Sequence, residues 1–264
     1  MPQSTNTNQA SAPAAIVLAA GKGTRMKSDL PKVIHEVGGR PMVCAVVDAC
    51  LAAGCQRIVA VVGFKQELVR QALAGYGDKV EFAVQQEQLG TGHAVMSASG
   101  LFGSPVAGSV CFVLAGDGPL IRKQTLLAML EAHRRTNAAA TMATSILDDP
   151  TGYGRIYRDA KTNRFIAIVE QKNATPEQLK IREVYPSYAC ADVGLMFQTL
   201  RQTPRNEVTG EYYFTDLFGS LAQQGKHVEV VPAVPPEDVL SINTLEELAK
   251  VDAIYRSRTG MPHA

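Results

Sequence analysis

Four cationic side chains gather in one short glycine-rich stretch near the N-terminus. The stretch is Ile16-Val17-Leu18-Ala19-Ala20-Gly21-Lys22-Gly23-Thr24-Arg25-Met26-Lys27, and Leu30-Pro31-Lys32 follows it. The small residues Ala19, Ala20, Gly21 and Gly23 allow backbone N–H groups to approach an anion closely. Arg25 offers a planar fork of donors and Lys32 a point charge, and both suit phosphate. The stretch therefore predicts a site for a phosphorylated ligand.

Two other glycine-rich phosphate loops have to be distinguished from this one. A Walker A loop requires G-x-x-x-x-G-K-[ST], which the residues after Gly21 do not provide. A dinucleotide-binding loop requires G-x-G-x-x-G or a final alanine; Gly21 and Gly23 fit, but Met26 does not, and the acidic residue for the ribose is absent. An NAD-dependent oxidoreductase is therefore disfavoured.

Two further polar stretches follow predicted strands. In the first, Gln85 to His93, the Gln85 amide carries an acceptor and two donors that can complement the imide edge of uracil. The alternative there is a polar loop in which Thr91 caps the next helix, and His93 is expected on that helix in a structural role. In the second stretch, Asp117 is expected on a tight turn after a strand. Its carboxylate is well placed to bind Mg²⁺; the alternative is that it forms an Asx-turn with its own backbone.

The string L-A-A-G-x-G-T-R-M-x-S-x-L-P-K resembles the signature of sugar-nucleotide pyrophosphorylases, a nucleotidyltransferase family. It is most similar to the uridylyltransferase domain of the bifunctional N-acetylglucosamine-1-phosphate uridylyltransferases. The resemblance extends from about Ala14 to Arg258 and includes one of their two activities, because the hexapeptide repeat of their left-handed β-helix acetyltransferase domain is missing. It implies Mg²⁺-dependent transfer of UMP from UTP to a sugar-1-phosphate.

The resemblance also implies a role for individual residues. Arg25 and Lys32 are the expected catalytic residues, and Asp117 and Asn243 the expected Mg²⁺ ligands, although Asn243 could alternatively be a neighbour of a helix N-cap. The expected nucleotide-binding residues are Leu18, Ala19, Ala20, Gly21, Gly23, Lys32, Gln85, Gly90 and Thr91. The expected sugar-binding residues are Ala115, Gly116, Gly154, Glu170 and Tyr185. The segment Gly210–Asp216 is assigned to packing and support of the site.

Two positions depart from the family pattern. Ala115 stands where the related enzymes have tyrosine, and Tyr185 stands where they have an asparagine that contacts the N-acetylated sugar. The reaction class is therefore better supported than the sugar. N-acetylglucosamine-1-phosphate is the first choice, glucose-1-phosphate is next, and a nucleotide-sugar-binding protein without turnover is the alternative of another class.

The elements that must position these residues follow a β-α-β rhythm. Strands are expected at Ala14–Leu18, Arg57–Val62, Val80–Val84, Val110–Leu114 and Ala140–Ile146, and helices at Met42–Ala53, Gln66–Leu73, Gly92–Ser99 and Lys123–Arg135. Later segments are expected to be strands at Arg155–Tyr157, Phe165–Glu170 and Ala189–Phe197, and helices at Thr215–Gln223 and Leu245–Arg258. This pattern predicts an α/β fold: a Rossmann-like, mostly parallel twisted sheet with helices on both faces.

The same pattern suggests how the chain is divided. Residues 1–13 are expected to form a disordered tail, and 14–243 a nucleotidyltransferase domain. Within that domain, 14–146 would bind nucleotide and 147–243 would form a smaller mixed sugar-binding subregion on the same sheet. Residues 244–264 would be a C-terminal helix and tail.

The bulk properties exclude several partner classes. A net charge of +1 over 264 residues gives no argument for nucleic acid or for a membrane surface. Five cysteines without zinc spacing suggest a reducing cytoplasm, with Cys44 and Cys111 buried in apolar runs. The N-terminus lacks signal-peptide features. A monomer or weak dimer is expected.

Overall fold

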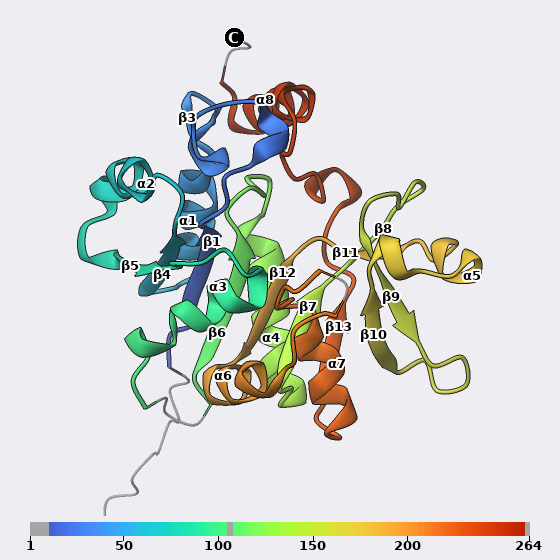
Figure 1. The fold of residues 1–264 in the computed structure, drawn as a ribbon. Coiled ribbons are helices and arrows are strands. Elements are labelled where there is room, and N and C mark those ends of the chain that lie inside the picture. The colour runs from blue at the N-terminus through green and yellow to red at the C-terminus, as the bar shows by residue number, and fades with distance from the viewer. Residues whose placement is uncertain (1–10, 105–107, 208, 262–264) are drawn as a thin grey trace, which may run out of the picture.

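The strands at the centre of the molecule are nearly continuous apolar runs. Such runs are expected because helices cover both faces of the main sheet. The computed structural model describes residues 11–104, 108–207 and 209–261. Its main sheet has seven strands in the order β13-β7-β12-β6-β1-β4-β5 (Figure 1). These are β1 (Ala14–Ala19), β4 (Arg57–Val62), β5 (Val80–Val84), β6 (Val110–Ala115), β7 (Ala140–Ala143), β12 (Tyr188–Asp192) and β13 (Val228–Val231). Only β12 runs antiparallel to its neighbours, among the strand pairs of this sheet.

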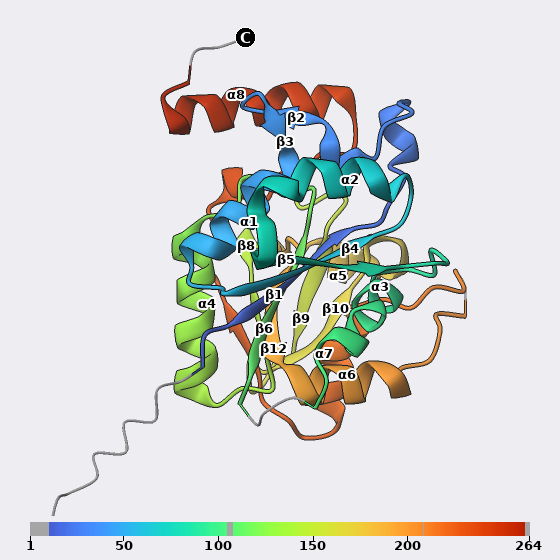
Figure 2. The same ribbon diagram turned by 90° about the vertical axis from the view of Figure 1, so that its left-hand side faces the viewer.

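The alternation of side chains along β1 separates two hydrophobic layers. Ala15, Val17 and Ala19 point into one layer and Ile16 and Ala20 into the other. The first layer lies under α1 (Met42–Ala52), α2 (Gln66–Leu73) and α4 (Lys123–Thr136). The second lies under α3 (Thr91–Ser97), α6 (Val193–Gln202) and α7 (Asp216–Gln223), on the opposite face of the sheet (Figure 2). The predicted α/β sheet with helices on both faces is confirmed.

A second, four-stranded sheet stands beside the main one, with the order β10-β9-β11-β8. Its strands are β8 (Ser145–Ile146), β9 (Gly154–Arg158), β10 (Phe165–Val169) and β11 (Glu183–Tyr185), all paired antiparallel. The expectation that these segments continue the main sheet is therefore wrong. The division at residue 146 does not separate the two sheets, because β12 and β13 return to the main sheet.

The predicted strand Ala189–Phe197 is wrong in its second half. The strand β12 ends at Asp192, whose carboxylate accepts a hydrogen bond from the Leu195 N–H at 2.9 Å and so caps α6. The apolar run continues through the cap because Val193, Met196, Phe197 and Leu200 are buried at helical spacing. One hydrophobic run thus contains both a strand and the first turns of a helix.

The remaining elements are short, apart from the last helix. A hairpin is formed by β2 (Glu36–Val37) and β3 (Arg40–Pro41), and the C-terminal helix α8 (Leu245–Thr259) packs on it (Figure 1). The other helices are α5 (Pro176–Leu179) and the 3₁₀ turns η1 (Thr24–Met26), η2 (Lys32–Ile34), η3 (Ala74–Lys79), η4 (Ser99–Leu101), η5 (Gln171–Asn173) and η6 (Pro236–Asp238).

Three predictions about the chain's periphery can be compared with the structure. The tail predicted for residues 1–13 lies outside the described residues as far as residue 10, as does the end of the predicted C-terminal tail. All five cysteines are buried and free, as expected for Cys44 and Cys111. Among the helices that the structure describes, none is long and apolar enough to span a bilayer.

Candidate active site

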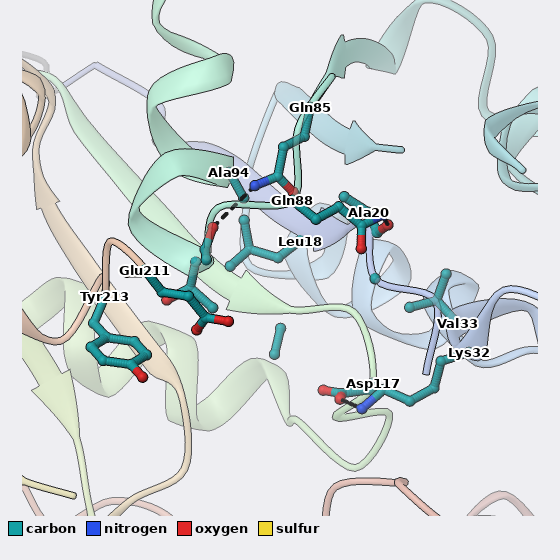
Figure 3. Close-up of a pocket in the computed structure, with 14 residues that line it drawn as sticks. Leu18, Ala20, Lys32, Val33, Gln85, Gln88, Ala94, Asp117, Glu211 and Tyr213 are labelled. Atoms are coloured by element: carbon teal, nitrogen blue, oxygen red, sulfur yellow. Dashed lines mark hydrogen bonds and ion pairs between the residues drawn. The ribbon is translucent and has the colours of Figure 1, made fainter. Parts of the chain in front are cut away.

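Three adjoining cavities lie beyond the carboxyl ends of β1, β5 and β6, the edge where α/β sheets bind ligands. The first cavity, about 330 Å³, is lined mainly by residues after these strands, including Ala20, Gln85 and Asp117 (Figure 3). The second, about 270 Å³, is lined by Lys22, Gly23, Thr24, Arg25, Lys32, Gln88 and Asn243. The third, about 350 Å³, extends toward the second sheet and includes Gly154, Glu170 and Tyr185.

The glycine-rich loop holds Lys32 directly against its backbone. Gly23 has a φ of 70°, and a Cβ atom built on it would lie 2.6 Å from Cβ of Lys32. A side chain at position 23 would therefore be strained and would displace the lysine. The Lys22 ammonium lies 5.4 Å from the centre of the Phe64 ring, a cation–π distance. The second cavity is lined by three cationic side chains, those of Lys22, Arg25 and Lys32, whereas Lys27, the fourth cation of the stretch, lines none of the three cavities.

Lys32 bridges the two oxygen-bearing side chains that the sequence proposes as metal ligands. Its ammonium forms an ion pair with the Asp117 carboxylate and donates a hydrogen bond of 2.9 Å to Asn243 Oδ1. Arg25 Nη2 donates a second hydrogen bond of 2.8 Å to the same oxygen. Oxygens from the turn after β6 and from the loop before α8 thus converge on a single cationic atom, although they lie far apart in the sequence.

This cluster lies where the three cavities meet. Lys32 lines the first and second cavities, Asp117 the first and third, and Asn243 the second and third. The Ile242 N–H donates to the Asp117 carbonyl at 3.1 Å and holds the two loops together. Asn243 is fixed in turn because its own N–H, like that of Thr244, donates to the Glu247 carboxylate in the first turn of α8.

Gln85 and the loop after it form the far end of the first cavity. Gln85 is 5% exposed, and its amide nitrogen donates to the Gly90 carbonyl at 3.0 Å. Thr91 does not cap its own helix, which corrects the alternative considered for it. Its hydroxyl instead accepts a hydrogen bond of 2.9 Å from the Phe214 N–H.

The sequence did not predict that the segment 211–214 lines this cavity. The Tyr212 N–H donates to the Leu89 carbonyl at 2.8 Å, and the Gly92 N–H donates to the Tyr212 carbonyl at 2.8 Å. Glu211 and Tyr213 consequently face the cavity (Figure 3). Gln88 was also missed; it donates to the Ala20 carbonyl at 2.8 Å and borders the first and second cavities. The pairing of 211–214 with 89–92 is a long-range contact for which no local sequence signal exists.

The third cavity brings together the predicted sugar-binding residues Ala115, Gly154, Glu170 and Tyr185. A Cβ atom at Gly154 would lie 2.7 Å from Cγ2 of Ile168, so only glycine fits there beside Glu170. Burial raises the pKa of the Glu170 carboxyl, although its hydrogen bond with Thr215 opposes the shift. The Tyr185 ring packs edge-on against Phe218 with centroids 5.6 Å apart, which anchors it in the wall of the cavity.

Two predicted site residues line none of these cavities. The side chain of Ala19 is 1% exposed and belongs to the hydrophobic layer under α1. The Gly116 N–H donates to the Leu18 carbonyl at 2.9 Å, and a Cβ atom there would lie 2.8 Å from that carbonyl oxygen. Ala19 and Gly116 therefore shape the turns that carry Ala20 and Asp117. Leu18, Ala20, Gly21, Gly90 and Thr91 line the first cavity as expected, and Gly23 lines the second.

Known proteins are similar to this chain over most of its length. The family model of the MobA-like NTP transferase domain matches residues 15–170. Bifunctional protein GlmU of Geobacter metallireducens is 44% identical over 245 residues, which are 93% of this chain and 51% of the relative. Bifunctional protein GlmU of Symbiobacterium thermophilum is 43% identical over 249 residues, or 94% of this chain and 52% of the relative. The chain spans about half the length of the curated relatives it matches.

Two solved structures of UDP-glucose pyrophosphorylase share the fold. One, complexed with UDP-glucose, superposes with a TM-score of 0.72 at 17% identity, covering 94% of this chain and 100% of that one. The other, in the apo form, has a TM-score of 0.75 at 16% identity with the same coverage. The matched family model includes the glycine-rich loop, Gln85, Asp117 and Glu170, which come together at the three cavities. The chain belongs to the MobA-like NTP transferase domain family.

Proposed function

We propose that the protein transfers UMP from UTP to a sugar-1-phosphate, with release of pyrophosphate. The observation that carries this proposal is the cluster of Lys32, Asp117 and Asn243 at the point where the three cavities meet. A nucleotidyl transfer needs a base site, a site for the leaving phosphates and an acceptor site, all meeting at the reacting phosphorus. The first, second and third cavities supply these in turn.

The base and the leaving group are bound by different parts of the glycine-rich edge. Gln85 would face the base, and Ala20 and Gly21 line the same cavity. Arg25 and the amides of the glycine-rich loop would hold the β- and γ-phosphates, with Lys22 adding positive charge to the same cavity. The oxidoreductase alternative loses support here, because the second cavity suits a polyphosphate and the family is that of an NTP transferase.

The acceptor would bind in the third cavity. The Glu170 carboxylate would accept hydrogen bonds from sugar hydroxyls, with the Gly154 backbone beside it. GlmU similarity makes N-acetylglucosamine-1-phosphate the first choice and the two UDP-glucose pyrophosphorylase structures make glucose-1-phosphate the second. Ala115 and Tyr185 line this cavity, and we expect their side chains to discriminate between the two sugar phosphates.

Asp117 and Asn243 fit Mg²⁺, because their oxygens already converge on one cationic atom, the Lys32 ammonium. One carboxylate and one amide oxygen suit this ion, which takes its remaining ligands from phosphates and water. Bound there, Mg²⁺ would neutralise phosphate charge. Its presence in the working enzyme, like the roles of these two residues, is part of the proposal.

The reaction needs alignment and charge neutralisation more than proton transfer. The phosphate oxygen of the sugar-1-phosphate attacks the α-phosphorus of UTP in line, and the bond from that phosphorus to the bridging oxygen of pyrophosphate breaks. Lys32 would stabilise negative charge on the α-phosphate while Arg25 holds the departing group. No general base is required, because the attacking phosphate is already ionised at neutral pH.

The test is a pyrophosphate-release assay with UTP and a panel of sugar-1-phosphates, with and without Mg²⁺. We expect turnover with N-acetylglucosamine-1-phosphate, and a kcat lowered by about 10²–10³ in Lys32→Ala, the size of one preorganised charge-stabilising group. The exposed Lys123 is the matched control, and Lys123→Ala should retain full kcat. Binding of UDP-sugars without any pyrophosphate release would instead favour a sensor. A Lys32→Ala protein with half the original kcat would remove Lys32 from the mechanism.

A further inference from the structure

Two neighbours, the Gly90 carbonyl and the His93 ring, determine the orientation of the Gln85 amide. Only the histidine nitrogen could be either a hydrogen-bond donor or an acceptor. Its nitrogen Nε2 lies 3.0 Å from the Gly90 carbonyl oxygen and 3.1 Å from Nδ1 of His93. A carbonyl oxygen can only accept, so the amide must present its NH₂ group rather than its oxygen to Gly90. The assignment of nitrogen and oxygen in this amide therefore does not depend on the protonation of the histidine.

The same geometry determines the tautomer of His93. One N–H of Gln85 donates to Gly90, and the other points at His93 Nδ1, which must then be an acceptor without a proton. The neutral ring carries its proton on Nε2. His93 lies in the first turn of α3, three residues after the N-cap Gly90, and its ring stacks beside Tyr212 with centroids 6.4 Å apart. The histidine is thus held between Gln85 and the segment 211–214.

Both donors of Gln85 are consequently engaged, and its oxygen Oε1 is the polar atom left for a ligand. No donor among the described residues hydrogen-bonds to this oxygen, and Gln85 lines the first cavity (Figure 3). An acceptor oxygen at the base end of the cavity matches a ring N–H group. Uracil carries such a group at N3, whereas N3 of cytosine is a lone pair that would face the Gln85 oxygen unpaired.

We propose that His93 is a positioning residue that selects the base by holding the Gln85 amide with its oxygen toward the cavity. The inference rests on the proposed function, since it assigns the first cavity to the base of a nucleotide. His93 touches no substrate in this account. Its Nδ1 lone pair occupies the second N–H of Gln85, so that rotation of the amide by half a turn would bring its oxygen against two acceptors, Gly90 and His93.

Two substitutions separate this role from simple packing. His93→Phe keeps an aromatic ring beside Tyr212 but removes the acceptor, whereas His93→Asn places an amide oxygen near the position of Nδ1. We expect the ratio of kcat/KM for UTP to that for CTP to fall about tenfold in His93→Phe, the usual effect of one neutral hydrogen bond. The ratio should stay within about threefold of the original in His93→Asn. An unchanged ratio in a folded His93→Phe protein would overturn the proposal.

Two further measurements keep the test decisive. Long-range ¹H–¹⁵N correlation of ¹⁵N-histidine-labelled protein should show His93 with its proton on Nε2, whatever the variants do; a proton on Nδ1 would overturn the inference. Calorimetric binding of UMP and CMP gives the base preference without turnover. Retained preference for UMP in a protein that releases no pyrophosphate would sink the proposed reaction while leaving the role of His93 intact.

Discussion

The Lys32 ammonium has two alternative partners, the oxygens of Asp117 and Asn243 or a substrate phosphate, and it cannot neutralise both at once. In this structure its ammonium neutralises the Asp117 carboxylate and donates to Asn243. The proposed reaction requires the same ammonium at a phosphate and a metal ion at the two oxygens. Because one cation occupies the place of another, nucleotide binding and metal binding should favour each other. Lys32 would turn from the carboxylate to the phosphate as both arrive.

This competition predicts that removal of the ammonium improves metal binding in the absence of nucleotide. We expect Lys32→Met to bind Mn²⁺, which shares the oxygen preference of Mg²⁺, about tenfold more tightly than the original protein, within the usual range of coupling between sites. Electron paramagnetic resonance of free Mn²⁺ measures this directly. The double variant Lys32→Met, Asp117→Asn should lose the gain. Equal Mn²⁺ affinity with and without Lys32 would refute the competition.

Glu170 illustrates a conflict between binding and stability. Burial raises the pKa of its carboxyl, so ionisation is less favourable in the folded protein than in the unfolded chain. The free energy of unfolding therefore declines as the pH rises from the ordinary glutamate pKa, about 4.3, through the raised value. The carboxylate is retained, in our proposal, because sugar hydroxyls need a charged acceptor there.

The variant Glu170→Gln should accordingly be more stable than the original protein at pH 7 to 8, with the difference shrinking toward pH 4. Urea unfolding at several pH values measures this. The same variant should raise KM for the sugar-1-phosphate by roughly 10-fold or more, because a hydrogen bond to a charged group contributes about 1.5–3 kcal/mol. A stability difference that grows on acidification would contradict the sign argued here.

At the scale of elements, the C-terminal helix braces the loop that carries Asn243. Asp238, 1% exposed in η6, accepts a hydrogen bond of 3.0 Å from Arg122 and pairs with Arg258 near the end of α8. Its carbonyl accepts from the Tyr188 hydroxyl at 3.1 Å. The helix begins two residues after Asn243, with Thr244 as its N-cap, and Arg258 in its last turn pairs with Asp238. Both sides of the loop that carries Asn243 are therefore held.

Arg258→Ala should therefore weaken the brace without touching any cavity. We expect the free energy of unfolding to fall by about 1–3 kcal/mol, since a buried carboxylate loses one of its charged donors. The exposed Lys250 on the same helix is the control, and Lys250→Ala should change stability by no more than about 0.5 kcal/mol. Urea unfolding of both proteins provides the comparison; equal effects would show that Asp238 is held by Arg122 alone.

Elements defined by local patterns were predictable, and those defined by distant pairing were not. The strands Arg57–Val62 and Val80–Val84 and the helix Gln66–Leu73 are observed with the predicted bounds, because apolar runs and a helical stripe mark them directly. The second sheet joins Ile146 to Glu183 and Val184 to Arg155, and nothing local fixes such a register. For the same reason, the sequence pointed to Gln85 and Asp117 but not to Glu211.

The site as a whole depends on segments from almost the entire chain. Arg25 contacts Asn243 across 218 positions of sequence, and the second sheet supplies Glu170 from the other side. The matched family model ends at residue 170, before Tyr185 and Asn243. A nucleotide bound across the first two cavities would therefore contact segments whose relative positions depend on the complete fold.

Binding of UTP should consequently stabilise the whole molecule and not one loop. A ligand at 100 times its Kd adds about 2.7 kcal/mol. For a chain of this size that amounts to a rise in Tm of roughly 5–10 °C, at about 2–4 °C per kcal/mol. We expect this shift with UTP and Mg²⁺ together in a thermal melt, and a smaller one with either alone because of the competition at Lys32.

The variant Gln85→Ala should reduce the shift, whereas NAD⁺, which the loop does not fit, should produce none. A shift with NAD⁺ as large as that with UTP would reopen the dinucleotide interpretation, and one with UTP that is unchanged in Gln85→Ala would place the base elsewhere.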